Sequence, residues 1–168
     1  MTKNQINSIA YGIVGCAIEV HRQFGPGLLE SVYQECLKAE LLKKGFDLKV
    51  EHHVPLFYKG EKLASKLKLD LLVNDQVIVE LKSVDTLAPV FTAQLLTYMK
   101  LAEKPKGLLI NFNSENIVSG SVALVNDFCF FAGLKFRDLV CFSVLSVKIN
   151  TRTLRIHTRY RCHSIISN

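Results

Sequence analysis

The sequence lacks the features that would direct a chain into a membrane or out of the cell. No uncharged apolar run approaches the roughly 18 residues that a membrane-spanning helix needs, and one of the longer candidates, Leu139–Val147, has only nine. The first twelve residues carry one lysine and contain neither the apolar block nor the small-residue cleavage site of a signal peptide. We therefore expect a cytoplasmic protein with no membrane partner.

The spacing of the cysteines gives no sign of disulfide bonds or of a zinc site. The five cysteines are an odd number, and they show neither a CxxC pair nor a spacing typical of zinc sites. We expect reduced thiols, as in most cytosolic proteins. The cysteines are Cys16, Cys36, Cys129, Cys141 and Cys162.

The charge is unevenly distributed along a chain of otherwise ordinary globular composition, 49% hydrophobic and 21% charged over 168 residues. A net charge of +6 would by itself suggest a nucleic-acid or anionic partner. Residues 1–116, however, hold 14 Lys+Arg against 13 Asp+Glu, a net +1, and residues 117–168 hold the other +5. The basic character therefore belongs to the C-terminal segment.

Hydrophobic periodicity predicts two helices followed by three strands, a helix and a strand. The first helix, over 4–22, has apolar residues every three or four positions, and the second runs from Leu29 to Gly45. Strands are predicted over 48–58, up to about 73, and over 77–82; a helix over 89–102 and a strand over 106–112 follow. This ααβββαβ order predicts an α/β fold with a mixed central sheet flanked by helices.

Three charged residues interrupt the apolar strands, which is costly unless the charges are paired or bind a metal. They are Asp70, Glu80 and Lys82. They could form a buried ion-pair cluster, or the polar face of a one-sided sheet. A three-residue loop over 74–76 would pair Val73 with Val77 and place Asp70 beside Glu80, whereas a two-residue loop would put the carboxylates on opposite faces.

A third interpretation of these charges is a catalytic site. Two facing carboxylates repel each other unless a cation lies between them, and hard oxygen ligands suit Mg²⁺. A lysine on the same face can orient or deprotonate an attacking water and stabilise negative charge on a phosphate. The combination is typical of phosphodiester hydrolysis.

The same residues resemble a known signature. Asp70, followed after a hairpin by Glu80-Leu81-Lys82, resembles the D…(D/E)xK signature of the PD-(D/E)XK nuclease superfamily, and Gln94 with Tyr98 resembles the QxxxY helix motif of its exonuclease-like branch. The segment from Glu19-Val20-His21 through Gly25 to Tyr33 is similar to the GxxExxY protein family, with Gly27, Glu30 and Tyr33 at the naming positions. The resemblance covers about 1–116 and implies a restriction-endonuclease-like core.

The resemblance also implies roles. Asp70, Glu80 and Lys82 would be catalytic, with Asp70 and Glu80 as the main ligands of Mg²⁺, or alternatively Mn²⁺, and Lys82 positioning or activating the attacking water. Glu30 would be an outer metal ligand. Gln94, Tyr98 and Tyr33 would bind substrate or support the site. The expected activity is metal-dependent hydrolysis of nucleic acid, with DNA the expected substrate; the alternative is a non-catalytic nucleic-acid- or protein-binding module that keeps the nuclease fold.

Residues 117–168 do not continue the resemblance, and we predict a boundary at 116 with an atypical extension after it. The extension combines a Phe-Cys-Phe-Phe run over 128–131 with four arginines, Arg152, Arg155, Arg159 and Arg161. The arginines could neutralise DNA phosphates. We favour the alternative, a segment of unrelated origin such as a shifted reading frame, because exposed aromatic clusters promote aggregation.

Overall fold

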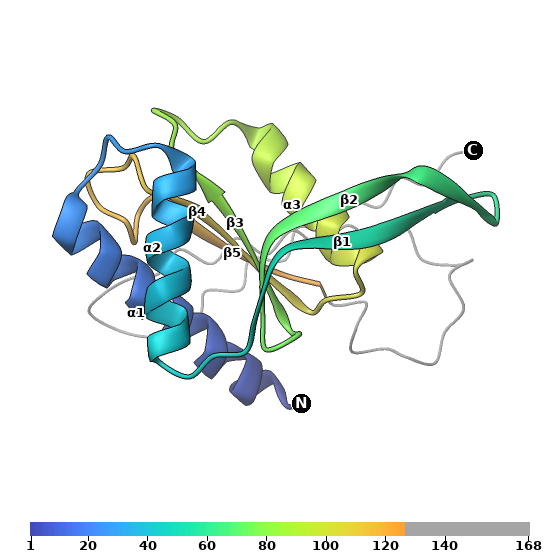
Figure 1. Ribbon diagram of the computed structural model, residues 1–168, viewed down its shortest axis with the longest axis horizontal. Coiled ribbons are helices and arrows are strands. Elements are labelled where there is room, and N and C mark those ends of the chain that lie inside the picture. Colours follow the sequence, from blue (N-terminus) through green and yellow to red (C-terminus); the bar gives the residue numbers. More distant parts are fainter. Residues whose placement is uncertain (127–168) are drawn as a thin grey trace, which may run out of the picture.

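The computed structural model describes residues 1–126, which form three helices and five strands (Figure 1). In chain order these are α1 (Lys3–Phe24), α2 (Glu30–Lys43), β1 (Leu48–Tyr58), β2 (Glu61–Val73), β3 (Val77–Lys82), α3 (Pro89–Leu101), β4 (Lys106–Asn111) and β5 (Ser121–Val125). The predicted ααβββαβ order is confirmed, and β5 is added to it. Within the described part of the chain, no helix is long and apolar enough to cross a membrane.

The five strands form one mixed sheet in the order β1-β2-β3-β4-β5. The β3–β4 pair is parallel, and the other pairs are antiparallel. The parallel pair is connected through α3, as a crossover connection requires. Strand β3 therefore lies at the centre of the sheet, and its first five residues are buried, so any charge on it needs a partner.

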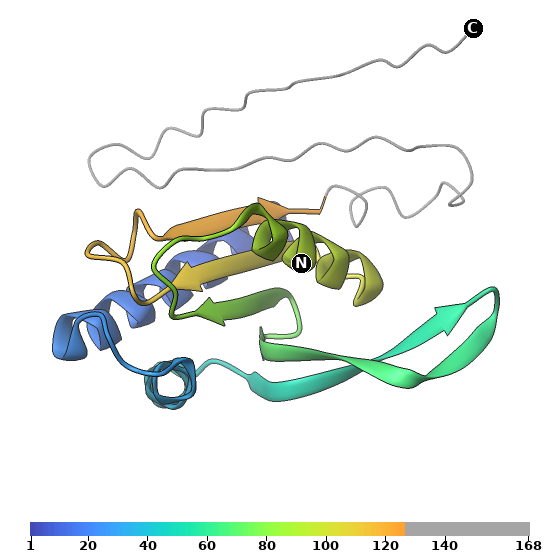
Figure 2. The same ribbon diagram turned by 90° about the horizontal axis from the view of Figure 1, so that it is seen from above.

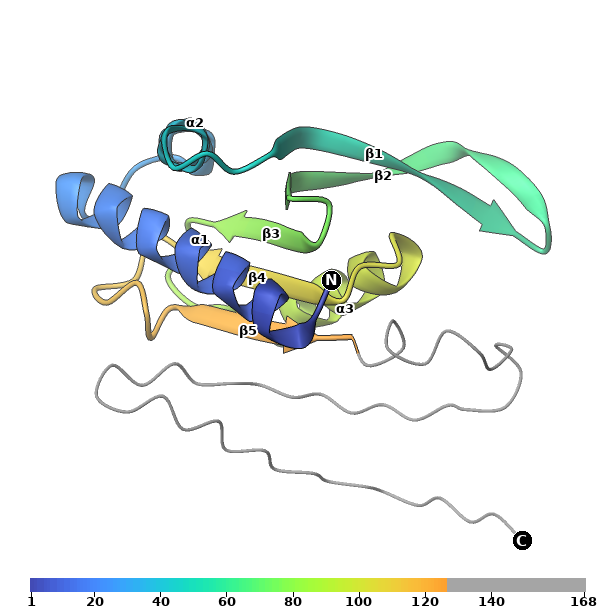
Figure 3. The same ribbon diagram turned by 90° about the horizontal axis from the view of Figure 1, so that it is seen from below.

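Helices cover both faces of the sheet (Figures 2 and 3). Helix α1 begins with a capping box between Thr2 and Gln5, and its buried stripe from Ile6 to Val20 packs with α2 against one face. Helix α3 packs Leu95 and Met99 against the other face. The predicted apolar stripe of the first helix is thus confirmed, and it forms one wall of the larger core.

The sheet extends past residue 116. Strand β5 pairs antiparallel with β4 over Ser121–Val125, a segment that the sequence analysis assigned to the extension. The sequence analysis missed β5 because its residues, Ser-Val-Ala-Leu-Val, do not alternate between apolar and polar. The predicted aromatic run and arginines of the extension lie outside the described residues.

Strands β1 and β2 continue well beyond the rest of the sheet as a two-stranded hairpin (Figures 1 and 3). Strand β2 pairs with β3 only over Leu71–Val73, whereas its pairing with β1 extends out to Glu61. The predicted turn at Lys59-Gly60 closes this hairpin, and both turn residues have positive φ. We call residues 52–69 the hairpin arm.

Candidate active site

The carboxylates of Asp70 and Glu80 come together through the β2–β3 hairpin. Val73 pairs with Val77, Leu72 with Ile78 and Leu71 with Val79, so the three-residue loop is confirmed and the two-residue alternative is wrong. Residues 74 and 75 of the loop have positive φ, which asparagine and aspartate tolerate better than most residues.

Asp70 lies where β2 separates from β3. The ladder between the two strands stops at Leu71, and the side chain of Asp70 continues it by accepting a hydrogen bond from the backbone N–H of Leu81 at 3.0 Å. The Asp70 carbonyl accepts a hydrogen bond from Gln34 of α2 at 3.4 Å. These contacts hold the half-buried carboxylate at the end of the β2–β3 ladder, near enough for its charge to act on Glu80.

Glu80 and Lys82 form an ion pair on the central strand. The Lys82 ammonium lies 2.9 Å from Oε1 of Glu80 and donates a second hydrogen bond to the Leu81 carbonyl at 2.6 Å. The side chains of Glu80 and Lys82 are only 5% and 12% exposed. Within the described residues, the other carboxylate oxygen of Glu80, Oε2, is buried and has no hydrogen-bond partner.

Glu30 approaches this pair from a different element. It is the first residue of α2, and its carboxylate lies 4.0 Å from the Lys82 ammonium. Leu29 gives the helix no side-chain cap, so an acidic residue in the first turn is favourable there. Lys82 thus lies between carboxylates from α2 and β3. The Asp70 charge acts on it as well.

The charges shift the pKa values of the site in a consistent way. Burial raises the pKa of Glu80, and the Asp70 charge adds to this, while the hydrogen bond from Lys82 opposes it. Burial also raises the pKa of Glu30 against the opposing Lys82 charge. Burial alone would lower the pKa of Lys82, but its hydrogen bond to Glu80 and the surrounding carboxylates outweigh burial and raise it. Lys82 therefore remains a cation in an acidic cluster.

Helix α3 contributes an aromatic side chain that the sequence analysis did not select. The Lys82 ammonium lies 5.5 Å from the centre of the Phe91 ring, within the range of a cation–π interaction. One turn further along, Gln94 donates a hydrogen bond to the Tyr98 hydroxyl at 2.5 Å, so the predicted i, i+4 pair is in contact. Both side chains are half-buried.

Tyr33 lies in the core and not at the surface of the site. It is fully buried and stacks on Phe112 with ring centres 4.5 Å apart. Its hydroxyl donates to the Gly25 carbonyl at 2.6 Å and accepts from the Leu28 N–H at 3.1 Å. Tyr33 thereby fixes the loop that leads into Glu30.

Two further side chains that the sequence analysis missed position the chain after Lys82. Asn111 of β4, paired with Lys82 in the sheet, accepts from the Val84 N–H at 3.1 Å and donates to the Val84 carbonyl at 2.7 Å. The Ser83 hydroxyl donates to the Leu28 carbonyl at 2.7 Å. A polar residue at the end of the buried strand 106–112 was the signal that could have identified Asn111.

Comparison with known proteins agrees with this geometry. The family model of the PD-(D/E)XK nuclease superfamily matches residues 7–123. The chain belongs to this superfamily. No curated protein and no solved structure matches it.

Members of this superfamily of nucleic-acid phosphodiesterases generally use Mg²⁺ or Mn²⁺. We therefore asked whether the residues around Asp70 and Glu80 fit a divalent cation. Within residues 1–126, no group of three or more His, Cys, Asp or Glu side chains is arranged to hold a metal. Magnesium, however, usually binds through one or two carboxylates together with waters and substrate phosphate. The Asp70–Glu80 pair and the partnerless Oε2 of Glu80 fit that kind of site.

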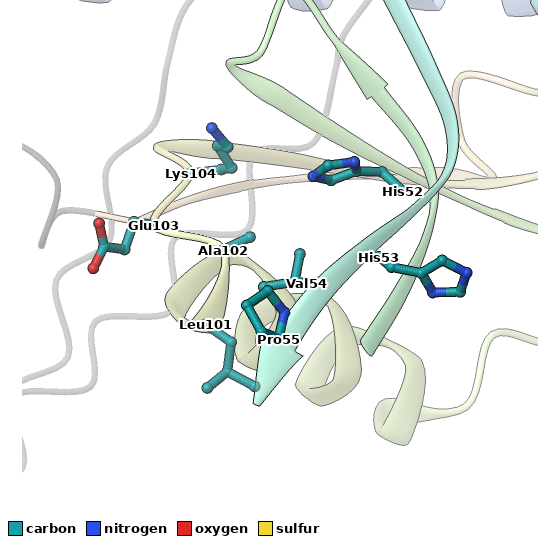
Figure 4. Close-up of a pocket in the computed structure, with 8 residues that line it drawn as sticks. All are labelled: His52, His53, Val54, Pro55, Leu101, Ala102, Glu103 and Lys104. Atoms are coloured by element: carbon teal, nitrogen blue, oxygen red, sulfur yellow. The ribbon is translucent and has the colours of Figure 1, made fainter. Parts of the chain in front are cut away.

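A separate hollow of about 220 Å³ lies between β1 and the C-terminal end of α3 (Figure 4). His52 projects from β1 toward the segment after α3, and His53 projects from the other side of the strand (Figure 4). The hollow is lined by residues 52–55 and 101–104 and by none of the nuclease signature residues. It belongs to the base of the hairpin arm.

Proposed function

We propose that the protein is a nuclease that hydrolyses phosphodiester bonds in DNA and requires Mg²⁺, with Mn²⁺ as an alternative. The observation that carries the proposal is the meeting of Asp70, Glu80 and Lys82 at the centre of the sheet, with one buried oxygen of Glu80 left without a partner. A stable ion-pair cluster would be expected to satisfy that oxygen, because a buried polar atom without a partner costs about 1–3 kcal/mol.

In this proposal Asp70 and Glu80 hold the cation, and Glu30 acts as an outer ligand. A bound divalent cation supplies charge neutralisation at the phosphate and activation of water. Lys82 holds the attacking water and stabilises negative charge on the phosphate as an ammonium donor, a role that its raised pKa favours over that of a base.

The other predicted residues have supporting roles. Gln94 and Tyr98 present a hydrogen-bonded pair one turn beyond Phe91, from where they contact the substrate backbone or brace Lys82. Tyr33 acts through the backbone, because its hydroxyl ties the Gly25–Leu28 loop to the start of α2. It positions Glu30 and does not touch substrate.

We further propose that the chain is a member of the GxxExxY family. Each naming position has a physical reason in the fold. Gly27 has φ +106°, which side chains rarely adopt, Glu30 reaches Lys82, and Tyr33 fixes the loop between them. The nuclease unit ends close after β5 in this proposal, and the remaining residues form the extension.

A cleavage assay tests the assignment. The full chain is incubated with single-stranded, duplex and branched DNA in Mg²⁺ or in EDTA. We expect cleavage only with the metal, and at least about a 100-fold loss in Asp70→Asn, Glu80→Gln and Lys82→Ala, because several kcal/mol of charge stabilisation depend on this site. Glu35→Gln, an exposed change on α2, is the matched control and should cleave normally. Equal cleavage by the site variants and the parent would refute the assignment.

One observation favours a second candidate, a binding module without turnover. Lys82 already neutralises Glu80 and occupies the Leu81 carbonyl, so the cluster is partly satisfied without a metal. This candidate predicts binding of nucleic acid or a protein with no metal-dependent cleavage. In the same assay it would give bound but intact DNA for the parent and all variants.

A further inference from the structure

The hairpin arm is exposed on both strands toward its tip. From Glu61 to Lys66 every residue of β2 is exposed, and at the end of β1 Phe57 and Tyr58 are each 62% exposed. The arm projects past the helices and the other strands (Figures 1 and 2). Nothing in residues 1–126 covers this surface.

The base of the arm is anchored firmly. Val54, Leu67 and Leu69 are buried in the same core cluster as Leu95 and Met99 of α3. A buried base gives the arm a defined direction relative to the site. The arm therefore has a buried attachment and an exposed tip.

The arm also concentrates positive charge. Residues 52–69 hold four lysines and one glutamate, a net +3, whereas the whole of residues 1–126 carries only +1. Lys68 pairs with Glu51. Within the described residues, the other three lysines, Lys59, Lys62 and Lys66, form no ion pair. The net charge of +1 over residues 1–126 is therefore the sum of +3 on the hairpin arm and −2 on the remaining described residues.

The tip adds apolar surface to this charge. Phe57 and Tyr58 precede the turn, and the Lys59 ammonium lies 5.5 Å from the centre of the Tyr58 ring. Exposed aromatic side chains next to lysines suit a surface that binds duplex DNA, because apolar side chains can contact base edges in the groove while the ammonium groups neutralise phosphates.

We propose that the hairpin arm is a docking surface for duplex DNA, with Lys59, Lys62 and Lys66 on the phosphates and Phe57 and Tyr58 at the groove. This inference rests on the proposed function, which makes DNA the substrate. A two-stranded ribbon fits the major groove of B-DNA. At roughly 3.3 Å per residue the arm extends about 30 Å from Asp70 to its turn, close to the roughly 34 Å of one duplex turn.

The position of the arm connects binding to cleavage. Strand β2 carries Lys66 and Lys68 four and two residues before Asp70. DNA held along the arm is therefore led toward the carboxylates at the point where β2 joins the sheet. The arm supplies positive charge for binding the duplex beside the acidic site, and not at the reacting phosphate itself.

The test measures binding of the full chain to a fluorescent duplex of about 30 base pairs (roughly three turns) in EDTA, where no cleavage is expected. The arm variant is Lys59→Gln/Lys62→Gln/Lys66→Gln. Its matched control is Lys38→Gln/Lys43→Gln/Lys44→Gln, in the C-terminal half of α2 and at its C-cap. We expect the arm variant to bind at least about tenfold more weakly. The slope of log K against log salt concentration is negative, and we expect its magnitude to fall by roughly one for each lysine removed. The control should retain the affinity and slope of the parent.

A second variant separates apolar contact from charge. Phe57→Ser/Tyr58→Ser should weaken binding without changing the salt slope, because it removes no charge. Circular dichroism spectra equal to the parent spectrum establish that the exposed substitutions leave the fold intact.

Several results would overturn the proposal: no duplex binding by the parent at low salt, an arm variant that binds like the parent, or tighter binding to single strands than to the duplex. Loss of a dimer in the aromatic variant with DNA binding unchanged would assign the tip to a second copy of the chain and overturn it as well. Failure of the nuclease proposal would appear separately, as absent cleavage in Mg²⁺ while binding in EDTA remains.

Discussion

Mg²⁺ is expected to raise the midpoint of thermal unfolding of the parent chain, and Glu80→Gln is expected to abolish that increase. The physical reason is the state of the Glu80 carboxylate. Its Oε2 is buried without a partner, and burial followed by the Asp70 charge raises its pKa. A cation bound only by the folded state removes both penalties, whereas the amide of the variant carries no charge to attract it.

The size of the effect follows from mass action. A ligand at 100 times its dissociation constant stabilises the folded state by about 2.7 kcal/mol. For a chain of this length, each kcal/mol shifts the midpoint by roughly 2–4 °C. The parent should therefore gain about 5–10 °C at saturating Mg²⁺.

The assay is differential scanning calorimetry of parent and variant in EDTA and across a Mg²⁺ titration at constant ionic strength. Glu35→Gln is the control, because it makes the same chemical change at an exposed position on α2, and it should shift like the parent. A Glu80→Gln variant that still gains as much as the parent would show that Mg²⁺ binds elsewhere, and the assignment of the site would have to be abandoned.

Three further outcomes are expected from chemical denaturation. Lys82→Met in EDTA should lower the free energy of unfolding by about 3 kcal/mol, because it leaves the buried Glu80 charge without its partner. The double variant Lys82→Met/Glu80→Gln should regain part of that stability. Equal losses in the single and the double variant would contradict the pairing. Gly107→Ala should lower the free energy of unfolding by about 1–3 kcal/mol, since the new Cβ would lie 2.6 Å from the sulfur of Met99. An unchanged denaturation midpoint would show that the core repacks around the methyl group without strain. Hydrogen bonds from Lys104 and Lys49 lower the pKa of Asp75 in the folded state below its ordinary value of 3.8. The contribution of Asp75 to stability is therefore fully present above pH 3.8 and is lost as the pH falls through the pKa of the folded state. Asp75→Asn should therefore cost up to about 1 kcal/mol at pH 7, and a cost that does not shrink toward pH 2 would refute this cause.

The parts of the site that the sequence predicted are those that local geometry determines. Alternation along a strand and the length of the 74–76 loop are enough to place Asp70 beside Glu80. The i, i+4 spacing is enough to bring Gln94 onto Tyr98. In each case the two residues are joined by a short segment of regular structure.

The parts that the sequence could not predict depend on packing between distant elements. Phe91 lies over Lys82 because of the way α3 crosses the sheet, and Asn111 reaches Val84 only because β3 and β4 pair in parallel. Neither contact has a signal in local periodicity. Tyr33 illustrates the converse, because a tyrosine at a motif position can act from the core through its hydroxyl.

The charge distribution around Lys82 favours the binding of a cation at the proposed site even though the chain is basic overall. Glu30, Asp70 and Glu80 surround one ammonium group, so the cluster keeps excess negative charge after Lys82 is counted. Negative charge at that point would repel a DNA phosphate unless another cation were added. Lys59, Lys62 and Lys66 of the hairpin arm lie at least four residues, roughly 13 Å, from Asp70, which is too far to supply that cation at the reacting phosphate. The proposed binding of substrate by the arm and the proposed charge neutralisation by a divalent ion at the carboxylates are therefore separate hypotheses, and the EDTA binding and Mg²⁺ cleavage experiments test them independently.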